Sequence, residues 1–432
     1  MSQSIANKQE QPASKGYREA LTLLRSCRSE HGFLATTETN HNYHRVWGRD
    51  SCIAGLAALL TDDDELIEGC RLSLETLARY QGPHGEIPSN VDPETERVSL
   101  GGTAGRVDAD LWFVITCCEY WQHTQNDTFI DGIFEPLEKV RQLLGAWEFN
   151  NRGLIYVPPT GDWADEYMQS GYVLYDQLLY LQAQKAFGKI HQYKHGSSDH
   201  ALDEKSARLE HLIRANYWFA EECETPRDIY HEVLFQKGCE AAPRRNGQYW
   251  MPFFSPVGYG YRFDSMANAL VMLFGVADGD QCDAVDEYIG QNIVPDEIKL
   301  LPAFNPVITP KDEGWDDLQM TFSHTFKNKP YEYHNGGLWP MVTGFYAASL
   351  AQRGKNDLAK SYTDGIHQAN LASDEDSEAH VFPEFLHGKE ITPGGTRQMA
   401  WSAGAAVLAE SYLEGKRLFG QESNNPGSSK KS

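Results

Sequence analysis

Residues 107–124 read VDADLWFVITCCEYWQHT, and residues 133–149 read IFEPLEKVRQLLGAWEF. Both stretches place apolar residues near positions i, i+3, i+4 and i+7, which is the spacing along one face of an α-helix. Asp residues at the start of the first stretch are typical of the first turn of a helix. The pair therefore predicts two consecutive helices.

The same periodicity recurs along most of the chain. Alternation of apolar and polar residues, which would indicate strands, is nearly absent, although YVPP (156–159) and PAFNPVI (302–308) can form short ones. Together with the two stretches above, the periodic segments predict about twelve helices in an all-α protein. The other ten segments are 17–29, 50–60, 63–81, 170–190, 201–220, 264–278, 282–294, 337–354, 357–372 and 398–418.

The loops between these helices fall into two kinds. Short turns alternate with long loops rich in Gly, Pro, His and aromatic residues, such as 81–106 and 150–169. Long irregular loops are uncommon in compact domains unless they carry function. Antiparallel helices with all long loops at one end predict an (α/α)6 toroid of six helical hairpins, with the long loops around a central funnel. A helical-repeat solenoid is the alternative, and the lack of a fixed-period repeat disfavours it.

The two ends of the chain differ from the rest. Residues 1–14 and 419–432 are polar and low in apolar content, so we expect disordered tails there and one domain over 15–418. The N-terminus has no apolar run of the kind found in signal peptides, and the cytoplasm is the expected location. None of the eight cysteines forms a C-x-x-C pair, and several lie in apolar helical runs. They are expected to be reduced, small, buried hydrophobes.

The overall charge limits the classes of partner. The chain has 61 acidic and 38 basic residues, a formal net charge of −23. Binding to nucleic acid needs a cationic face, and anionic membranes repel an acidic protein, so neither partner is expected. A neutral small molecule such as a sugar meets no such objection. The oligomeric state is left open.

Two segments place carboxylates among bulky apolar residues. Residues 161–168 read GDWADEYM, and residues 382–387 read FPEFLH. Apolar surroundings raise the pKa of a carboxyl group, as the general acid of a glycosidase requires, and a second carboxylate must act as base or nucleophile. Asp162 and Asp165 are both candidates for the acid, and Asp162 is alternatively a helix N-cap. Glu384 is the candidate for the second carboxylate, or else an ordinary loop residue.

Four motifs in this sequence resemble those of known glycosidases. VWGRDSCIAGLAAL (46–59) resembles a signature of the amylo-α-1,6-glucosidase domains of glycogen-debranching enzymes, and HNGGLWPMVTGF (334–345) resembles another of their segments. FPEFLHG with TPGGTRQMAWSAGA (392–405) resembles alkaline/neutral invertases, and 161–180 resembles both groups. The resemblance implies a six-hairpin glycoside hydrolase that needs no metal or organic cofactor.

The resemblance also implies roles for individual residues. It makes Asp165 the general acid and Glu384 the general base acting on water. The residues expected to line the sugar pocket are Trp47, Arg49, Asp50, Asp162, Trp163, His334, Asn335, Trp339, Gln398 and Trp401. Phe382 and Phe385 stand where the invertases carry Trp and Tyr, which leaves the substrate open.

Other constellations allow two interpretations each. Asp108, near a helix start, either stabilises the helix dipole or contacts substrate. Arg262 and Asp264 either contact substrate or, for Asp264, cap a helix. The H-x-x-H spacing of His41 and His44 has no partner cluster, so no metal site is expected. The glycine-rich GGTAGR (101–106) lacks the P-loop pattern and is not expected to bind phosphate.

The sequence thus predicts an inverting glycoside hydrolase that cleaves an α-glucosidic bond in a small sugar or oligosaccharide. One alternative is a sugar epimerase, isomerase or phosphorylase on the same toroid, with His334 or His387 as acid and base. The other alternative is a non-catalytic sugar-binding protein, which sugars would stabilise thermally without turnover.

Overall fold

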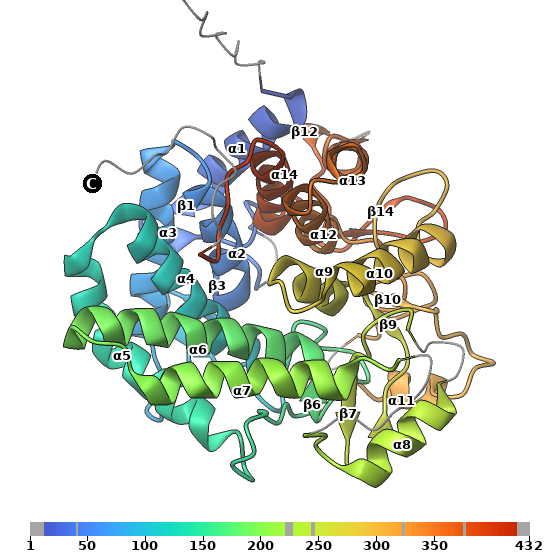
Figure 1. The fold of residues 1–432 in the computed structure, drawn as a ribbon. Coiled ribbons are helices and arrows are strands. Elements are labelled where there is room, and N and C mark those ends of the chain that lie inside the picture. The colour runs from blue at the N-terminus through green and yellow to red at the C-terminus, as the bar shows by residue number, and fades with distance from the viewer. Residues whose placement is uncertain are drawn as a thin grey trace, which may run out of the picture.

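The computed structural model describes residues 13–39, 42–220, 228–242, 247–321, 325–374 and 377–420. These residues form a mostly helical protein, as the periodicity predicts (Figure 1). The helices are α1 (Lys15–Cys27), α2 (Gly48–Leu59), α3 (Asp64–Arg79), α4 (Asp108–Thr124), α5 (Asp127–Ala146), α6 (Leu174–His195), α7 (His200–Tyr217), α8 (Glu232–Ala241), α9 (Ser265–Leu273), α10 (Gly279–Asn292), α11 (Trp315–Gln319), α12 (Pro340–Gln352), α13 (Asn356–Asn370) and α14 (Ala400–Leu413).

All twelve predicted helices are present, and two short ones were missed. Helix α11 has only five residues, and α8 buries only Phe235, Gly238 and Cys239, so neither presents a long apolar stripe. Helix α2 begins at Gly48, so its first turn includes Arg49, which was expected to precede the helix, together with Asp50. Of the expected tails, residues 1–12 and 421–432 lie outside the described residues.

The strands are short and lie in the connections between helices. They form two- and three-stranded antiparallel sheets, ordered β1-β2, β3-β4-β5, β6-β7-β8, β9-β10, β11-β12 and β13-β14. Their bounds are β1 (Arg28–Ser29), β2 (Gly32–Phe33), β3 (Val46–Trp47), β4 (Asn90–Asp92), β5 (Arg97–Ser99), β6 (Tyr172–Val173), β7 (Phe253–Ser255), β8 (Gly258–Tyr259), β9 (Phe263–Asp264), β10 (Phe304–Asn305), β11 (Ser373–Asp374), β12 (Ser377–His380), β13 (Phe385–Leu386) and β14 (Pro393–Gly394).

Six helices form the buried centre of the molecule. Helix α2 packs against α4, α4 against α6, α6 against α9, α9 against α12, α12 against α14, and α14 against α2, so the series of contacts closes on itself. These helices are apolar on nearly every side, which is the pattern of a helix surrounded by protein. Small residues allow close approach, since a Cβ added to Gly344 on α12 would lie 2.7 Å from the Cβ of Ala405 on α14.

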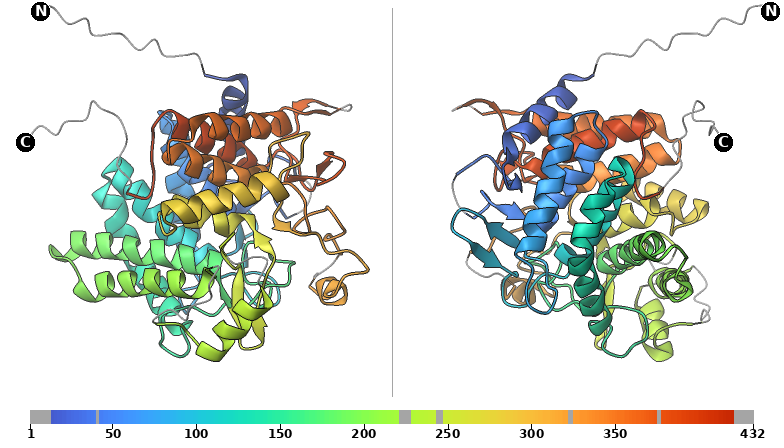
Figure 2. Two further views of the ribbon diagram at one scale, coloured as in Figure 1. Left: turned by 45° about the vertical axis from the view of Figure 1, so that its right-hand side comes forward. Right: turned by 90° about the vertical axis from the view of Figure 1, so that its left-hand side faces the viewer.

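The remaining long helices cover this centre. Helix α1 packs on α14, α3 on α2, α5 on α4, α7 on α6 and α13 on α12, and Figures 1 and 2 show α6 and α7 side by side as one hairpin. Helix α10 is linked to α12 by Asp286. This residue accepts a hydrogen bond of 2.9 Å from the hydroxyl of Tyr346 and forms an ion pair with Arg353. The outer helices are amphipathic, with apolar residues inward and charged residues outward.

Most cysteines behave as predicted, and one does not. Cys27, Cys52, Cys70, Cys117, Cys118 and Cys282 are free and buried. Cys239 is disulfide-bonded, so the expectation that every thiol is reduced is wrong at this position. Among the described residues, no helix combines the length and the apolar character needed to cross a bilayer.

Candidate active site

The site lies where the inner helices begin. Trp47 precedes α2, Asp264 precedes α9 and Trp339 precedes α12, while Asp108 is the first residue of α4. Since consecutive helices run in opposite directions, the inner helices start at one end, where their N-terminal dipoles favour negative charge. Asp50 in the first turn of α2 and Asp108 at the start of α4 are in this position. The long loops that precede these helices supply the other side chains.

Glu384 is held by the hairpin that follows it. Its backbone N–H donates to the carbonyl of Thr396 at 2.8 Å, and the Thr396 N–H donates back to Glu384 Oε2 at 2.9 Å. The hydroxyl of Tyr43 donates to Glu384 Oε1 at 3.0 Å. Burial raises the pKa of Glu384, and the bonds from Thr396 and Tyr43 oppose that rise. The carboxylate is therefore fixed at both oxygens and only 4% exposed.

A glycine makes this arrangement possible. Gly395 has a φ of 71°, a left-handed conformation that residues with a Cβ seldom adopt. A Cβ at this position would lie 2.2 Å from Oε2 of Glu384. Both its backbone conformation and the space beside it therefore require glycine.

Asp165 lies on the loop between Pro158 and Gly171. Its Oδ2 accepts a hydrogen bond of 2.7 Å from Nη2 of Arg106, and its Oδ1 accepts one of 3.4 Å from the hydroxyl of Tyr333. Burial acts to raise the pKa of Asp165, but the positive charges around it, that of Arg106 foremost, hold the pKa below its ordinary value. The side chain remains 19% exposed, so it is accessible from the site.

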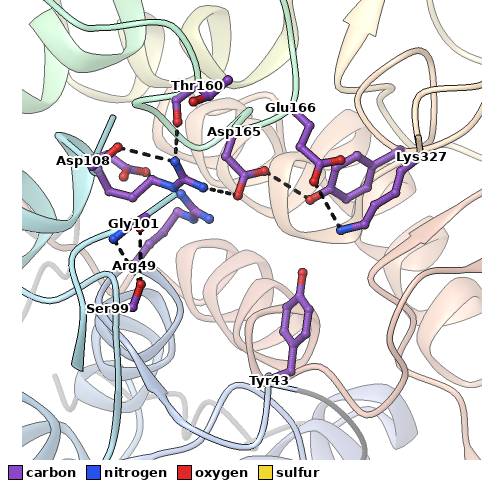
Figure 3. A network of polar contacts seen from close by, with 12 residues as sticks. Tyr43, Arg49, Ser99, Gly101, Asp108, Thr160, Asp165, Glu166 and Lys327 are labelled. Atoms are coloured by element: carbon purple, nitrogen blue, oxygen red, sulfur yellow. Dashed lines mark hydrogen bonds and ion pairs between the residues drawn. The ribbon is translucent and has the colours of Figure 1, made fainter. Parts of the chain in front are cut away.

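The two carboxylates lie around the same pair of tyrosines. Burial is the main cause of the raised pKa of Tyr43, and the charges of Glu384 and Asp165 come next. The pKa of Tyr333 is raised by burial, then by the charge of Asp165 and, less strongly, by that of Glu384. In Figure 3 the hydroxyl of Tyr43 points into the space between its own ring and the side chains of Asp165 and Glu166. The segments around 165 and 384 therefore meet in one site.

An ion pair borders this site. Lys327 Nζ lies 3.9 Å from Oε1 of Glu166 and 4.8 Å from the ring centroid of Tyr333 (Figure 3). Burial raises the pKa of Glu166, and the charge of Lys327 partly opposes the rise. The ammonium group thus places positive charge beside Asp165 and Tyr333.

Arg49 and Asp108 join the starts of α2 and α4. Nη1 of Arg49 donates to Asp108 Oδ2 at 2.7 Å, and the Tyr175 hydroxyl donates to the same oxygen at 3.1 Å. The guanidinium lies 5.8 Å from the ring centroid of Trp401. Asp108 is thus an ion-pair partner at a helix start, and a role in the helix dipole alone does not account for its contacts.

Several buried carboxyl groups lie close to this pair. Burial raises the pKa of Asp50 to about 7 and that of Asp162 to about 8. The negative charge of Asp108 adds to the rise at Asp162. Neither oxygen of Asp50 accepts a hydrogen bond from the described residues. Asp162 accepts one from the Gln169 amide and caps no helix, so the N-cap alternative for it is wrong. Asp264 does cap α9, and burial raises its pKa to about 7.

Aromatic rings pack beneath these polar groups. Trp339 stacks on His334 at 5.3 Å between centroids and meets Trp163 and Trp401 edge-on at 5.5 and 5.7 Å. All four side chains are at most 3% exposed. Burial lowers the pKa of His334 to about 3, so its imidazole is neutral at physiological pH. This property removes support for His334 as a proton-transferring acid.

Two of the predicted pocket residues, Asn335 and Gln398, bind backbone groups, and a third, Arg262, is incompletely bonded. The Asn335 amide binds the backbone of Ile308 and Asn328, and the Gln398 amide donates to the carbonyl of His380. These contacts place both amides in the support of the loops. Arg262 is partly buried, and its Nε has no hydrogen-bond partner among the described residues.

Trp47 and the H-x-x-H stretch lie at the edge of the site. The Trp47 ring stacks on Tyr43 at 5.4 Å between centroids, so it supports the tyrosine that binds Glu384. Nδ1 of His44 lies 3.2 Å from the carbonyl oxygen of Thr36, and His41 lies outside the described residues. Within the described part of the chain, no group of three or more His, Cys, Asp or Glu side chains is arranged to hold a metal ion.

Several residues of this site were not predicted from the sequence. Each stands within a few positions of a predicted motif: Tyr43 before WGRD, Arg106 in GGTAGR, Tyr333 before HNGG, and Glu166 beside Asp165. Lys327 comes from the segment before YEYHNGG. Adjacency to the motifs was the only available signal, because their partners are distant in sequence.

Comparisons with known proteins relate the chain to two glycosidase families. Residues 219–415 match the alkaline and neutral invertase family, and residues 26–171 match the amylo-α-1,6-glucosidase family. The chain has the six-hairpin glycosidase fold and is related to both families. The two matches divide the motifs between them, with WGRD and Asp165 in the second and Glu384 in the first.

Individual relatives are distant but cover most of the chain. A probable alkaline/neutral invertase D of Arabidopsis thaliana is 21% identical over 429 residues, covering 88% of this chain and 77% of that protein. The chloroplastic alkaline/neutral invertase E of the same plant is 23% identical over 453 residues, covering 91% of this chain and 71% of that protein.

Two solved structures share the fold. A mannosylglycerate hydrolase from Thermus thermophilus in complex with glucose has a TM-score of 0.63 and 16% identity, covering 91% of this chain and 99% of that one. A bacterial glucoamylase complexed with acarbose has a TM-score of 0.62 and 14% identity, covering 93% of this chain and 55% of that one. At these identities, the likeness concerns the fold.

Proposed function

We propose that this protein is an inverting glycoside hydrolase, built on an (α/α)6 toroid over residues 15–418, that cleaves an α-glucosidic bond in a small sugar or oligosaccharide. The observation that carries the proposal is the convergence of Asp165 and Glu384 around Tyr43 and Tyr333. The closed series of inner-helix contacts supports the toroid. Distant relatedness to invertases and amylo-α-1,6-glucosidases supports the reaction class.

The proposed reaction needs two proton transfers. Glu384 takes a proton from a water whose oxygen attacks the anomeric carbon. The bond from that carbon to the leaving oxygen breaks as Asp165 donates a proton to this oxygen. Inversion requires a separation of about 6.5–9.5 Å between the carboxyl groups, enough for the water. Both carboxyl groups return to their starting protonation states by exchange with solvent.

Each carboxyl group has surroundings that bear on its role. Glu384 accepts hydrogen bonds at both oxygens, which keeps it oriented toward a single water. Asp165 is paired with Arg106 before substrate binds, and it must hold a proton to act. A bound sugar excludes water from around Asp165, which favours the neutral carboxyl group. The charged Arg106 opposes this, so we expect activity to be highest on the acidic side of neutrality.

The side chains at the helix starts are suited to hold the sugar. Asp50 and Arg49 present buried groups that can bind hydroxyls, and charge-assisted hydrogen bonds of this kind are strong. Trp47 lies at the edge of the site, where an aromatic face can stack on a sugar ring. Sucrose, isomaltose-like oligosaccharides and glucosyl-polyols all fit this chemistry, and the relatedness to invertases favours sucrose as the first substrate to test.

The experiment follows a panel of α-glucosides by NMR, which identifies both the bond cleaved and the anomer released first. We expect the β-anomer of glucose as the first product, and Asp165→Asn and Glu384→Gln each to lower kcat by orders of magnitude without loss of folding. Near-normal turnover in either variant would remove that residue from its role. Release of a single epimerised sugar, or thermal stabilisation by sugars without turnover, would favour the other two classes of function.

A further inference from the structure

Arg106 also lines a cavity to which neither Asp165 nor Glu384 contributes, called here the cavity behind Arg106. It has a volume of about 470 Å³ and lies between the loop before α4 and the C-terminal end of α5. Its walls are mainly apolar and include Ile87, Leu143, Trp147, Phe149, Tyr156 and Pro158. Small-molecule pockets are typically about 300–1,000 Å³ and combine apolar walls with a few polar groups. The size and composition of this cavity match that description.

Two polar side chains of the wall are incompletely bonded. Arg106 and Asp110 both line the cavity. Nε of Arg106 and Oδ2 of Asp110 are buried and have no hydrogen-bond partner among the described residues. Asp110 itself is 1% exposed, and its other oxygen accepts a hydrogen bond of 2.8 Å from the N–H of Ile87. An unpaired buried polar atom costs about 1–3 kcal/mol, so a ligand that bonds these groups gains affinity.

The mouth of the cavity carries an exposed aromatic residue in an unusual conformation. Phe149 is 75% exposed and has a φ of 44°, which is disfavoured for a residue with a Cβ. Its ring meets that of Tyr156 edge-on at 6.0 Å between centroids. Strain of this kind persists where surrounding structure enforces it, often at ligand sites. Here it holds an aromatic ring at the entrance of an apolar cavity.

The chemistry of the walls selects among ligands. Burial raises the pKa of Asp110 well above its ordinary value, so its carboxyl group is neutral, and the remaining charges of Arg106 and Glu86 are opposite. The site therefore suits a neutral molecule. A sugar would bury several hydroxyls against apolar walls without partners, whereas a ring with one hydroxyl would bury one and satisfy it. Aromatic walls also favour an aromatic ring.

We propose that the cavity behind Arg106 is a binding site for a small aromatic alcohol, such as a phenol. Its hydroxyl bonds Arg106 and Asp110, and its ring packs among Trp147, Phe149 and Tyr156.

Occupancy of this cavity is coupled to the active site through Arg106. The guanidinium donates to Asp165 Oδ2 at 2.7 Å and to the carbonyl of Thr160, and Arg106 also lines the cavity. Thr160 has a φ of 64°, a strained conformation for a β-branched residue, which directs its carbonyl to Arg106. A ligand hydroxyl that accepts from Nε draws the guanidinium toward the cavity, and the larger separation weakens the effect of its charge on Asp165. This coupling rests on the proposed role of Asp165, whereas the binding does not.

The binding test uses p-cresol, with toluene and glucose for comparison, in calorimetry and ligand-observed NMR on the full chain. We expect p-cresol to bind more tightly than toluene, which lacks the hydroxyl, and glucose not to compete with it. Ala104 lines the mouth and is exposed, whereas its exposed neighbour Thr103 does not line the cavity. Ala104→Trp should weaken p-cresol binding by about tenfold or more, equivalent to about 1.4 kcal/mol, while Thr103→Trp should not.

Three results would overturn the assignment: no binding of p-cresol, equal loss in both tryptophan variants, or displacement of p-cresol by glucose. The coupling is tested by the pH profile of kcat/KM. Saturating p-cresol should move the alkaline limb to higher pH in the wild type and not in Ala104→Trp, because the Arg106 charge lowers the pKa of Asp165 less when the guanidinium is drawn toward the cavity. An unchanged limb refutes the coupling. A protein that cleaves no glycoside refutes the proposed function instead, and the binding result then stands alone.

Discussion

The hydrogen bond from Tyr43 to Glu384 offers a quantitative test of the site. Tyr43→Phe removes only the hydroxyl, which lies 3.0 Å from Glu384 Oε1. A hydrogen bond to a charged group is worth about 1.5–3 kcal/mol. If the bond orients the base throughout the reaction, its loss should lower kcat/KM by roughly 10- to 150-fold, since about 1.4 kcal/mol corresponds to a factor of ten.

The variant should also change the pH dependence in a defined direction. The Tyr43 bond favours the charged form of Glu384, so its removal raises a pKa that burial has already raised. A general base must be ionised, and activity falls as the pH drops through its pKa. The acidic limb of the kcat/KM profile should therefore move to higher pH in Tyr43→Phe.

The chain supplies a matched control for this change. The Tyr180 hydroxyl donates to Glu148 Oε1 at 2.7 Å, and Glu148 is 4% exposed, as is Glu384. Tyr180→Phe therefore removes the same kind of bond away from the site. Both variants should lose comparable stability in denaturant unfolding, while only Tyr43→Phe loses activity, measured on the α-glucoside that the wild type cleaves fastest. Equal activity losses, or wild-type activity in Tyr43→Phe, would refute the reasoning.

Three further changes test other parts of the structure. Arg106→Gln removes the positive charge that most lowers the pKa of Asp165, so this pKa rises and the alkaline limb of the kcat/KM profile should move to higher pH. An alkaline limb at the wild-type pH would contradict Asp165 as the acid. Gly395→Ala and Gly196→Ala both place a Cβ on a left-handed residue, with φ of 71° and 72°. Gly196→Ala should cost about 1–2 kcal/mol in unfolding experiments, and Gly395→Ala should cost more because Glu384 must also move. A Cβ at position 395 would lie 2.2 Å from Oε2 of Glu384, whereas a Cβ at position 196 has no atom within 4 Å, so only Gly395→Ala should lose activity. Retained activity in Gly395→Ala would argue against Glu384 as the base. Burial raises the pKa of Asp162 from 3.8 to about 8, so the folded state holds its proton more tightly than the unfolded state and stability falls as the pH rises from about 4 to 8. Asp162→Asn should flatten this decline in the thermal midpoint, and an unchanged slope would show that Asp162 does not titrate in this range.

The sequence by itself determined the helices and the motifs. Helical periodicity is a local property. It predicted twelve of the helices because each has an apolar stripe long enough for the helical spacing to be recognised in the sequence. It failed for α8 and α11, because neither has a long apolar stripe. The motifs around Arg49, Asp165, His334 and Glu384 predicted which loops carry polar groups, since carboxylates among aromatic residues are unusual outside sites that use them.

Only the tertiary structure decided how these groups are paired. Tyr43 and Glu384 are 341 positions apart, and Arg106 and Asp165 are 59 positions apart. Their contacts therefore depend on the packing of the six inner helices into a closed series. The pKa directions followed from the same packing. Both segments set a carboxylate among aromatic residues, yet Arg106 lowers the pKa of Asp165 while burial raises that of Glu384. A pKa depends on the charges and solvent around a group in space, and sequence neighbours do not supply that information.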